Sequence, residues 1–325
     1  MKLISIVIPC YNEEDNIVEL YGKIKDIFKR LSRYQYECIF IDNDSKDKTV
    51  NILRKMALSD NHIKIIINAR NFGHIRSPYY GLLQTNGDAS ILIAADLQDP
   101  PQIIYDFILA WESGYKIVIG IKEKSEESRI MFAIRRLYYK FVTAIAEIDL
   151  VRNFTGFGLY DRAFLNILKK IDDPYPYFRG FISDIGFSRK EICYTQPIRK
   201  HGKTKNNFYT LYDTAMLGIT NYSKLPIRLA TISGFILSIL SFSLAIFFLI
   251  LKLIFWKSFS MGIAPILCGL FFFFSVQLFF TGILGEYIGS IHTKILKRPL
   301  VIEEERVNFD IDQKKRHSQD EKVIT

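Results

Sequence analysis

The chain has 325 residues, and its 43 Lys and Arg against 34 Asp and Glu leave a formal net charge of +9 at pH 7. This length allows one sizeable soluble domain plus a small membrane module, and a positive excess suits an anionic membrane surface, a phosphorylated substrate or nucleic acid. Nucleic acid is not expected as a partner, because the basic residues lack aromatic stacking platforms in a soluble groove. Most of the lysines need do no more than keep the surface soluble.

The cysteines and the N-terminus point to a cytoplasmic soluble part. Cys10, Cys38, Cys193 and Cys268 show neither CxxC nor ligand-like spacing, which predicts small core residues in a reducing compartment rather than disulfides or metal ligands. The apolar run over residues 1–10 is short and has no small-residue cleavage site, so no signal peptide is expected. We therefore expect the soluble domain on the cytoplasmic side of a membrane.

Strands and helices alternate in the first part of the chain. Residues 3–9 are a continuous, largely β-branched run, which is expected of a strand buried on both faces in a parallel sheet. Further strands are expected at 36–42, 63–67 and 90–94, and helices at about 13–32, 47–58 and 76–85. Ser45 or Asp44 is the expected N-cap of the second helix. The alternation predicts an α/β fold with a doubly wound sheet covered by helices.

Polar and acidic clusters follow three of these strands, at residues 11–15, 42–47 and 96–99. In doubly wound sheets ligands bind outside the carboxyl ends of the strands, so the clusters are expected to converge on one edge. Like charges brought together destabilise a fold unless a cation or donor groups compensate. A divalent ion carrying a diphosphate would compensate them, and the pattern therefore favours a ligand of that kind.

Two long apolar segments, at roughly 228–251 and 263–289, close the C-terminal part. Each is long enough to cross a hydrocarbon core of about 30 Å as a helix, and basic residues flank them on the side expected to be cytoplasmic. Residues 206–225 carry apolar side chains roughly on one face, which fits either a helix in the membrane interface or an ordinary packed helix. Glu286 is a candidate functional group unless it lies at the interface. The charged tail beyond residue 300 is expected to be largely disordered.

Six short motifs then give the chain a family resemblance. They are Val-Ile-Pro-Cys-Tyr-Asn-Glu-Glu (7–14), Ile-Asp-Asn-Asp-Ser-Lys-Asp-Lys-Thr (41–49), Ala-Arg-Asn-Phe-Gly (69–73), Asp-Leu-Gln-Asp-Pro (96–100), Gly-Lys-Thr-Lys (202–205) and Leu-Gly-Glu-Tyr-Ile-Gly (284–289). In type and order they resemble the motifs of the inverting family-two glycosyltransferases with a GT-A fold. More narrowly, they are similar to those of polyprenyl-phosphate glycosyltransferases such as bactoprenol glucosyltransferases and dolichol-phosphate mannose synthases. The resemblance runs from about Ile4 to Pro299.

This resemblance implies a domain organisation. A cytoplasmic GT-A domain with a Rossmann-like doubly wound sheet would occupy residues 1–205, and an interfacial amphipathic helix would occupy residues 206–225. Two transmembrane helices would follow within residues 226–291, and residues 292–325 would form a cytoplasmic tail.

The resemblance also implies a donor site at the carboxyl edge of the sheet. The residues expected to bind the nucleotide of a UDP- or GDP-sugar are Pro9, Tyr11, Glu13, Asp42 and Asp44. Asp96, with help from Gln98, would hold Mg²⁺ or Mn²⁺, because carboxylate oxygens suit hard cations. Such an ion offsets the charge that builds on the leaving diphosphate. The residues expected to act in catalysis are Asp96, Asp99, Arg199 and Lys205.

Structural roles stay open for several of these residues. Asp42 would equally form an Asx turn, Glu13 would favour the dipole at the start of a helix, and Asp96 would cap a helix before Pro100. Arg70 would equally pair with a carboxylate at the sheet edge. For Asp42 and Asp96, their company in the acidic clusters makes ligand contact the preferred interpretation.

Two positions depart from the family pattern. Ala94 stands where the family usually has the first acid of Asp-x-Asp, and Gly156 stands where bactoprenol glucosyltransferases carry an acid proposed as the base. A phosphate monoester has its second pKa at about 6, so a lipid phosphate is largely a dianion at neutral pH and can attack without giving up a proton. It needs positioning and charge management instead. Asp161, followed by Arg162, is expected to be a helix cap or part of a structural ion pair.

Basic residues are expected to supply that positioning. The expected lipid-phosphate ligands are Arg135, on a helix expected at 126–147, and Arg199, Lys203 and Lys205, just before the amphipathic helix. Their alternative role is a general basic collar on anionic lipid.

Together these features predict a multi-pass membrane enzyme. It would transfer one sugar with inversion from a nucleotide diphosphate sugar, UDP favoured, to undecaprenyl phosphate at the cytoplasmic face of a bacterial inner (plasma) membrane. It would act as a homo-oligomer, with a tetramer as one form, and its product would serve modification of a cell-envelope polysaccharide. A processive transferase is disfavoured, because it needs more spans. The alternative is a catalytically silent membrane scaffold that kept the fold but lost acids at Ala94 and Gly156.

Overall fold

The computed structural model describes residues 1–124, 151, 153–197, 208–255 and 263–309. The chain divides into two compact units. The first comprises Met1–Tyr139, Asp149–Asn207 and Leu296–Thr325, and the second comprises Lys140–Ile148 and Phe208–Ile295.

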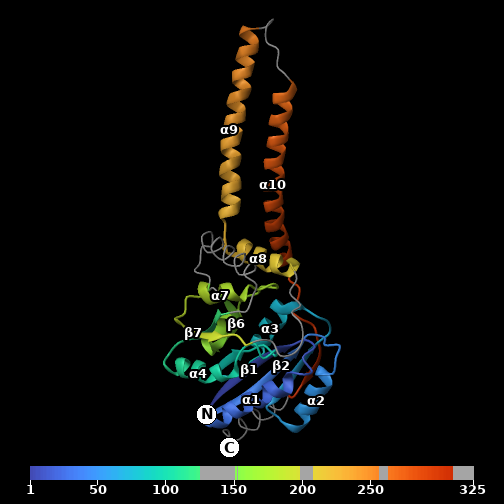
Figure 1. The fold of residues 1–325 in the computed structure, drawn as a ribbon, viewed down its shortest axis with the longest axis vertical. Coiled ribbons are helices and arrows are strands. Elements are labelled where there is room, and N and C mark those ends of the chain that lie inside the picture. Colours follow the sequence, from blue (N-terminus) through green and yellow to red (C-terminus); the bar gives the residue numbers. More distant parts are fainter. Residues whose placement is uncertain (125–150, 152, 198–207, 256–262, 310–325) are drawn as a thin grey trace, which may run out of the picture. The chain divides into compact units, whose positions relative to one another are not determined.

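Within the described residues, the first unit is built on an eight-stranded sheet with the order β7-β5-β6-β4-β1-β2-β3-β8 (Figure 1). The strands are β1 (Lys2–Cys10), β2 (Tyr34–Asp42), β3 (Ile63–Asn68), β4 (Ala89–Leu92), β5 (Ile117–Lys124), β6 (Phe154–Asp161), β7 (Arg189–Thr195) and β8 (Glu303–Val307). β1 pairs in parallel with β2 and β4, and β2 pairs in parallel with β3. β6 and β8 run antiparallel to their neighbours. The expected strand and helix alternation is confirmed over β1 to β4, and the complete sheet is mixed.

Helices cover both faces of this sheet. They are α1 (Ile17–Arg30), α2 (Thr49–Ser59), α3 (Gly73–Leu83), the short 3-10 helix η1 (Pro101–Ile103), α4 (Ile104–Glu112), α6 (Arg162–Leu168) and α7 (Phe178–Asp184). Buried side chains of α1, α2 and α4 join one apolar core, and those of α3, α6 and α7 join another. The sheet therefore lies between two helical layers, as a largely parallel sheet requires.

The isoleucine-rich run of β1 supplies both cores. Ile4, Ile6 and Ile8 belong to the core on the α1 side, whereas Val7 belongs to the core on the α3 side. All four side chains are fully buried. Since successive side chains of a strand point to opposite faces, a strand covered on both sides has no position for a polar residue facing water. This explains the continuous apolar pattern.

Two local expectations are wrong. α2 begins at Thr49 with Lys48 at its N-cap and no side-chain cap, so neither Ser45 nor Asp44 caps it. Ser45 instead bonds to the carboxylate of Asp42 at the end of β2. Cys193 is exposed, because it lies on β7 at the margin of the sheet.

The other cysteines follow the expectation where they are described. Cys10 and Cys38 are buried and free, as predicted. The side chain of Cys268 lies outside the described residues.

The expectation of a disordered tail beyond residue 300 is wrong for β8. Residues Glu303–Val307 pair antiparallel with β3 and close that side of the sheet. Their charges are matched locally, since Tyr80 donates to Glu303 at 2.8 Å and Arg306 donates to Gln84 at 2.9 Å. An edge strand tolerates charged side chains, because only its backbone must pair. Residues 310–325 lie outside the described part of the chain.

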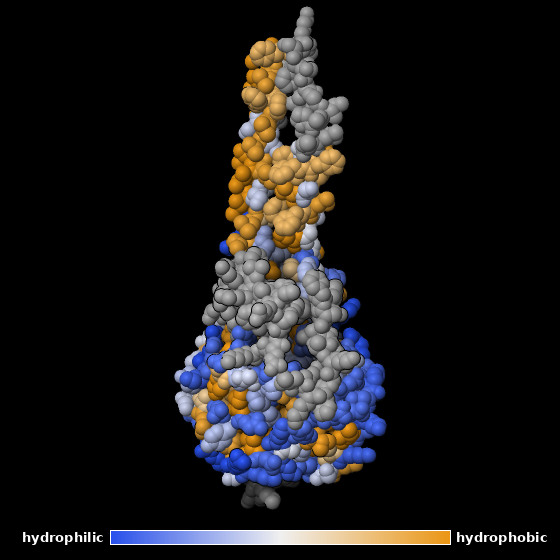
Figure 2. All heavy atoms as spheres, in the orientation of Figure 1, coloured by the Kyte–Doolittle hydropathy of each residue, from blue (hydrophilic) through white to orange (hydrophobic). Residues whose placement is uncertain are grey.

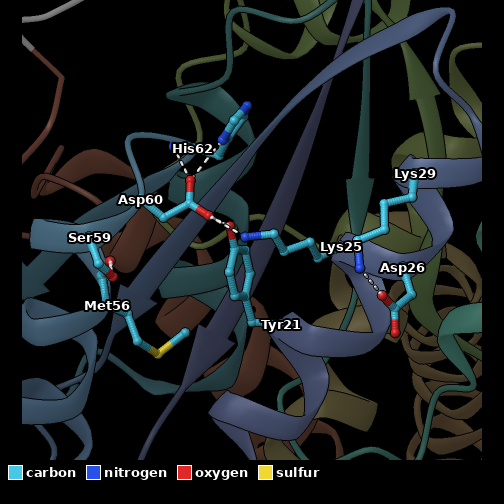
Figure 3. A network of polar contacts seen from close by, with 8 residues as sticks. All are labelled: Tyr21, Lys25, Asp26, Lys29, Met56, Ser59, Asp60 and His62. Atoms are coloured by element: carbon cyan, nitrogen blue, oxygen red, sulfur yellow. Dashed lines mark hydrogen bonds and ion pairs between the residues drawn. The ribbon is translucent and has the colours of Figure 1, made fainter.

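A polar network fastens α1 to the turn between α2 and β3 (Figure 3). The carboxylate of Asp60 accepts hydrogen bonds from Tyr21 Oη at 2.6 Å and from Lys25 Nζ at 3.1 Å. It also lies 2.7 Å from Nδ1 of His62. Burial by itself raises the pKa of Asp60, but the donors from Tyr21, His62 and Lys25 outweigh it and hold the pKa below its ordinary range. The ionised carboxylate therefore stabilises the fold.

We expect Asp60→Asn to lower the free energy of unfolding by about 1–2 kcal/mol at pH 7, because it removes a charge that three donors stabilise. The wild-type advantage should decline as the pH falls below about 4, where the carboxylate of the unfolded chain is protonated, and it should be lost completely only when the folded carboxylate is protonated as well. Thermal unfolding of the detergent-solubilised chain at several pH values measures this. Asp26→Asn is the matched control, since Asp26 pairs only with exposed Lys29; an equal effect of both substitutions would contradict the prediction.

The second unit consists, where described, of α8 (Phe208–Tyr222), α9 (Leu225–Ile254) and α10 (Ile263–Ile295). Two described segments are long and apolar enough to cross a membrane, Leu225–Phe248 and Gly269–Ile295, with mean hydropathies of 2.1 and 1.5. Their described side chains are largely exposed, and Figure 2 shows hydrophobic residues along the coloured parts of the two helices. A surface of this kind suits a hydrocarbon environment.

Polar contacts join α8 to α10 within this unit. Tyr212 Oη donates to Glu286 at 2.7 Å, and Tyr287 Oη donates to the carbonyl oxygen of Ser223 at 2.6 Å. Glu286 therefore has a partner on the helix expected to be amphipathic. The expected helix at 206–225 is confirmed as α8, and its place in a membrane interface stays a prediction.

Candidate donor site

The carboxyl ends of β1, β2 and β4 bring the polar clusters together at one edge of the sheet. Cys10 at the end of β1 is paired with Asp42 at the end of β2, and Val7 of β1 is paired with Leu92 of β4. The amide of Ile93 continues this pairing by donating to the carbonyl oxygen of Val7 at 3.0 Å. The predicted convergence of the loops after these strands is thus confirmed.

Reciprocal hydrogen bonds lock the loops after β1 and β2 to each other. The amide of Asn12 donates to Ser45 Oγ at 2.8 Å, and the amide of Lys46 donates to Asn12 Oδ1 at 2.7 Å. The amide of Glu13 donates to Thr49 Oγ1 at 2.9 Å. Because each loop both donates and accepts, neither can shift without breaking bonds in the other. They form one rigid platform at the sheet edge.

Left-handed backbone conformations shape all three loops. Asn12 and Asp44 have φ of 56° and 66°, and Leu97 has φ of 59°. Asn and Asp enter this region more readily than other side chains, whereas Leu in it is an outlier. Strained backbone clusters at ligand sites, where the surroundings hold it in place. The position of Leu97, next to Asp96, therefore marks the loop after β4 as a functional element.

The predicted nucleotide ligands fall into two groups. Pro9, Tyr11 and Asp44 keep accessible surface, whereas Asp42 is fully buried and Glu13 is 9% exposed. The accessible group can touch a ligand directly. The buried pair lies behind it and shapes the loops.

Asp42 holds its own turn. Its carboxylate accepts from Ser45 Oγ at 2.5 Å and from the amide of Ser45 at 2.9 Å. Burial raises the pKa of Asp42, and the bonds from Ser45 oppose that rise. The turn-forming reading of this residue is confirmed, and its contact with a nucleoside stays a prediction.

Glu13 precedes α1 rather than lying in its first turn. Asn16 Nδ2 donates to its carboxylate at 2.6 Å, and the amide of Ile17 donates to its carbonyl oxygen at 3.2 Å. Glu13 therefore orients Asn16, the N-cap residue of α1. Its role at a nucleotide stays a prediction.

Asp96 lies in the strained loop and is half-buried. Its carboxylate accepts from the amide of Gln98 at 3.2 Å. The reading of Asp96 as a helix cap is wrong, because no side chain caps η1 or α4. A ligand role for Asp96 stays a prediction.

The donor set of this loop fits a metal ion that arrives with a phosphorylated ligand. Among the described residues, no group of three His, Cys, Asp or Glu side chains is placed to hold a metal. Asp96 and Gln98 offer oxygen ligands from one loop, and Mg²⁺ is usually held by one or two carboxylates completed by substrate phosphates and water. Ala94 at the start of this loop is consistent with such an incomplete protein site.

Asp99 supports the loop from behind. It is 5% exposed, and Tyr194 Oη of β7 donates to its carboxylate at 2.6 Å. Burial raises the pKa of Asp99 to about 6, and the nearby charge of Asp96 adds to this rise. The hydrogen bonds from Tyr194 and from the amide of Ala94 oppose it. This geometry suits a positioning residue, and the predicted part of Asp99 in catalysis stays a prediction.

The raised pKa of Asp99 predicts how stability depends on pH. Its folded value of about 6 exceeds its ordinary value of 3.8, so this residue favours the fold fully below pH 3.8, and that contribution is lost as the pH rises through about 6. The loss amounts to about 3 kcal/mol. Asp99→Asn should flatten this part of the stability profile, which thermal unfolding in EDTA measures. Asp106→Asn, at an exposed position of α4, is the control, and an unchanged slope in Asp99→Asn would contradict the assignment.

Gly156 has a backbone that only glycine adopts without strain. Its φ is +108°, and a Cβ placed there would lie 3.4 Å from Leu92 Cδ2. Tyr160 Oη donates to its carbonyl oxygen at 2.6 Å and holds this conformation. The backbone conformation at Gly156 therefore does not suit an acidic side chain, which agrees with the absence of an acid at this position.

We expect Gly156→Asp to destabilise the chain by about 1–2 kcal/mol and to give no gain in activity, because the strain of the positive φ comes with any side chain. Gly156→Ala should cost a similar amount and serves as the control for strain alone. Melting temperature and sugar-transfer rate are the two measurements. A faster Gly156→Asp variant of unchanged stability would refute this account.

Asp161 is a structural residue, as expected. It is the N-cap of α6 and accepts from the amide of Ala163 at 2.9 Å, from Trp111 Nε1 at 2.7 Å and from Lys116 Nζ at 3.2 Å. Burial raises the pKa of Asp161, but these three bonds together bring it below its ordinary value. Its acceptor positions are occupied, so the carboxylate is a poor candidate for a base.

Asn43 is a site residue that sequence reasoning missed. It is 8% exposed, and its Oδ1 accepts from the amide of Phe72 at 2.8 Å and from Asn68 Nδ2 at 3.2 Å. Its Nδ2 donates to Asn71 Oδ1 at 2.9 Å. The sequence signal that could have identified Asn43 was its place between Asp42 and Asp44 in the turn motif. Arg70 pairs with no carboxylate among the described residues and donates to the carbonyl oxygen of Asn71.

The residues predicted to hold a lipid phosphate lie outside the described residues. They are Arg135, Arg199, Lys203 and Lys205. Their roles stay predictions.

The chain is similar in sequence to known proteins. Residues 5–180 match the model of glycosyl transferase family 2. The chain is 33% identical over 299 residues to an uncharacterized glycosyltransferase, YkcC, from Bacillus subtilis, with 92% of each chain covered. It is 31% identical over 300 residues to the SfII prophage-derived bactoprenol glucosyl transferase of Shigella flexneri, covering 92% of this chain and 96% of that protein.

A solved structure is similar to this chain at lower sequence identity. Glucosyl-3-phosphoglycerate synthase from Mycobacterium tuberculosis, in complex with Mn²⁺, UDP-glucose and phosphoglyceric acid, has a TM-score of 0.45 and 16% identity. The match covers 67% of this chain and 78% of that chain.

Proposed function

Because this chain belongs to glycosyl transferase family 2 and is a glycosyltransferase, we propose that it transfers one sugar, with inversion, from a nucleotide diphosphate sugar to undecaprenyl phosphate. UDP is the favoured nucleotide. The observation that carries the proposal is the presence, in one chain, of the acidic edge at β1, β2 and β4 and of two membrane-length apolar helices. A chain with both parts suits a reaction between a water-soluble donor and a lipid acceptor.

On the donor side, the platform built from the loops after β1 and β2 would bind the nucleotide. Pro9, Tyr11 and Asp44 are accessible there, and Asp42 and Glu13 hold the loops that carry them. Asp96 and Gln98 would hold Mg²⁺ or Mn²⁺ together with the donor phosphates. When bound, the ion offsets charge on the leaving diphosphate.

On the acceptor side, a lipid phosphate needs no protein base. It is largely a dianion at neutral pH, since its second pKa is about 6, and it attacks the anomeric carbon directly. This is consistent with Gly156 and with the occupied carboxylate of Asp161. Arg135, Arg199, Lys203 and Lys205 would position the phosphate and balance its charge.

The setting proposed for this reaction is the cytoplasmic face of a bacterial plasma membrane. The two helices would span it, and the chain would assemble as a homo-oligomer, a tetramer being one form. The polyprenyl-linked sugar would then supply an enzyme that modifies a cell-envelope polysaccharide. Relatives named bactoprenol glucosyl transferases support this acceptor class.

Transfer should be seen when membranes containing the protein receive undecaprenyl phosphate, Mg²⁺ and a panel of radiolabelled UDP- and GDP-sugars. We expect label from one donor in the organic phase, a loss of about a hundredfold or more in Asp96→Asn, and loss on adding EDTA. Asp106→Asn, the same change at an exposed position of α4, should retain full transfer. No label from any donor, beside an active control enzyme, would favour a catalytically silent scaffold instead.

A further inference from the structure

Three arginines gather at the β3 side of the sheet, outside the donor site. The guanidinium groups of Arg70 and Arg76 lie over the same ring, that of Phe72, at 4.1 Å and 5.3 Å from its centroid. Arg76 Nη2 donates to the carbonyl oxygen of Pro299 at 2.6 Å. Arg298 adjoins Pro299 in the chain, so segments more than two hundred residues apart in sequence meet here.

These arginines carry positive charge that the described part of the chain does not balance. Among the described residues, no carboxylate forms a salt bridge with Arg70, Arg76 or Arg298. Nε of Arg76 is buried without a hydrogen-bond partner. The pKa of Arg76 is lowered, first by burial and then by the charges of Arg70 and Arg298. Like charges held together in this way are stabilised by an anion.

The chemistry of the cluster suits a phosphate group. A guanidinium presents several N–H donors in a planar fork that matches phosphate oxygens. Arg76 spends one donor on Pro299, and the exposed side chain of Arg298 forms no hydrogen bond or ion pair among the described residues. Donors therefore remain for a ligand.

The cluster starts away from the loop that carries Asp96. Arg70 is the second residue after β3, and β3 is separated from β4, the strand that leads to Asp96, by β2 and β1. Three strand spacings amount to about 14 Å, whereas reacting atoms must approach to about 3–3.5 Å. A phosphate at the Arg70 end of the cluster is therefore not placed for transfer at the Asp96 loop, and competition with farnesyl phosphate tests whether the acceptor reaches the cluster.

The chain itself points to the source of this phosphate. Arg298 is the third residue after the end of α10 at Ile295, and three residues extend at most about 11 Å. If α10 spans a bilayer, Arg298 must lie in or near the headgroup layer, where anionic lipids attract basic residues. This step rests on the membrane setting of the proposed function.

We propose that Arg76 and Arg298, with Arg70 beside them, form a binding site for the phosphate of an anionic bilayer phospholipid. Such a lipid would attach the loop after β3 to the membrane surface. Phe72, whose ring lies under Arg70 and Arg76, donates its amide to Oδ1 of Asn43 in the nucleotide turn. The lipid would thereby steady the donor platform without touching the donor.

Lipid retention tests this site without any sugar donor, so its outcome is independent of transfer activity. The full-length protein in detergent is incubated with dioctanoyl phosphatidylglycerol or dioctanoyl phosphatidylcholine, and native mass spectrometry reports the lipid retained. We expect retention of phosphatidylglycerol to fall about tenfold in Arg298→Gln and in Arg76→Gln, as loss of a charge-assisted bond predicts. Arg30→Gln, at the exposed end of α1, should not change it.

Two competitors separate the sources of phosphate. Glycerol phosphate and farnesyl phosphate should each displace little phosphatidylglycerol from this site. Displacement by glycerol phosphate would show a site for free phosphate, and displacement by farnesyl phosphate would assign it to the acceptor; either result overturns the proposal. Unchanged retention in Arg298→Gln also overturns it, because this exposed side chain makes no described contact on which folding depends.

Discussion

The pairing of β1 with β2 in one register is the constraint on which the candidate site depends. It sets Cys10 beside Asp42, so that the loops leaving these strands start at the same level. The bonds between Asn12, Ser45 and Lys46 are possible only from that starting point. A slip of one residue would turn every side chain of β1 to the other face and into the opposite core, where its shape does not match the packing. Burial of β1 on both sides therefore protects the geometry of the site.

The acidic residues at this edge have different roles according to how deeply they are buried. Asp42, Glu13 and Asp99 are buried and accept hydrogen bonds that hold loops, whereas Asp44 and Asp96 keep accessible surface. Buried carboxylates cost free energy unless donors satisfy them. The site meets that cost with three donors: Ser45 donates to Asp42, Asn16 to Glu13 and Tyr194 to Asp99. Rigidity at the edge is thus obtained from acids that need not touch a ligand.

The C-terminal part of the first unit ties distant segments to this edge. After the second unit, which ends at Ile295, the chain contributes β8 to the sheet beside β3. Pro299, which lies between α10 and β8 in the chain, accepts a hydrogen bond from Arg76. The amide of Phe72 then connects this region to Asn43 by donating to its side-chain Oδ1. A membrane-length helix is in this way followed, within a few residues, by contacts that reach the nucleotide turn.

Sequence reasoning succeeded where local patterns have a single physical solution. The apolar run of β1, the strand and helix alternation, and the lengths of the two apolar helices each follow from short-range periodicity. Acidic clusters after parallel strands must share one edge, whatever the details of packing. Asp161 was identified as structural because a helix cap needs only its immediate neighbours.

Tertiary structure alone decided the features that depend on distant partners. The charged sequence of β8 did not predict a strand, because its pairing with β3 and its contact with Tyr80 join residues far apart in the chain. The same reason applies to Tyr194 behind Asp99 and to Asn43 beside Phe72. The sequence by itself determined the strands β1 to β4, their acidic edge and the membrane-length helices, since these arise from periodicity along the chain. Which acids support the loops and which face a ligand depended on depth of burial, and burial is a property of the folded chain.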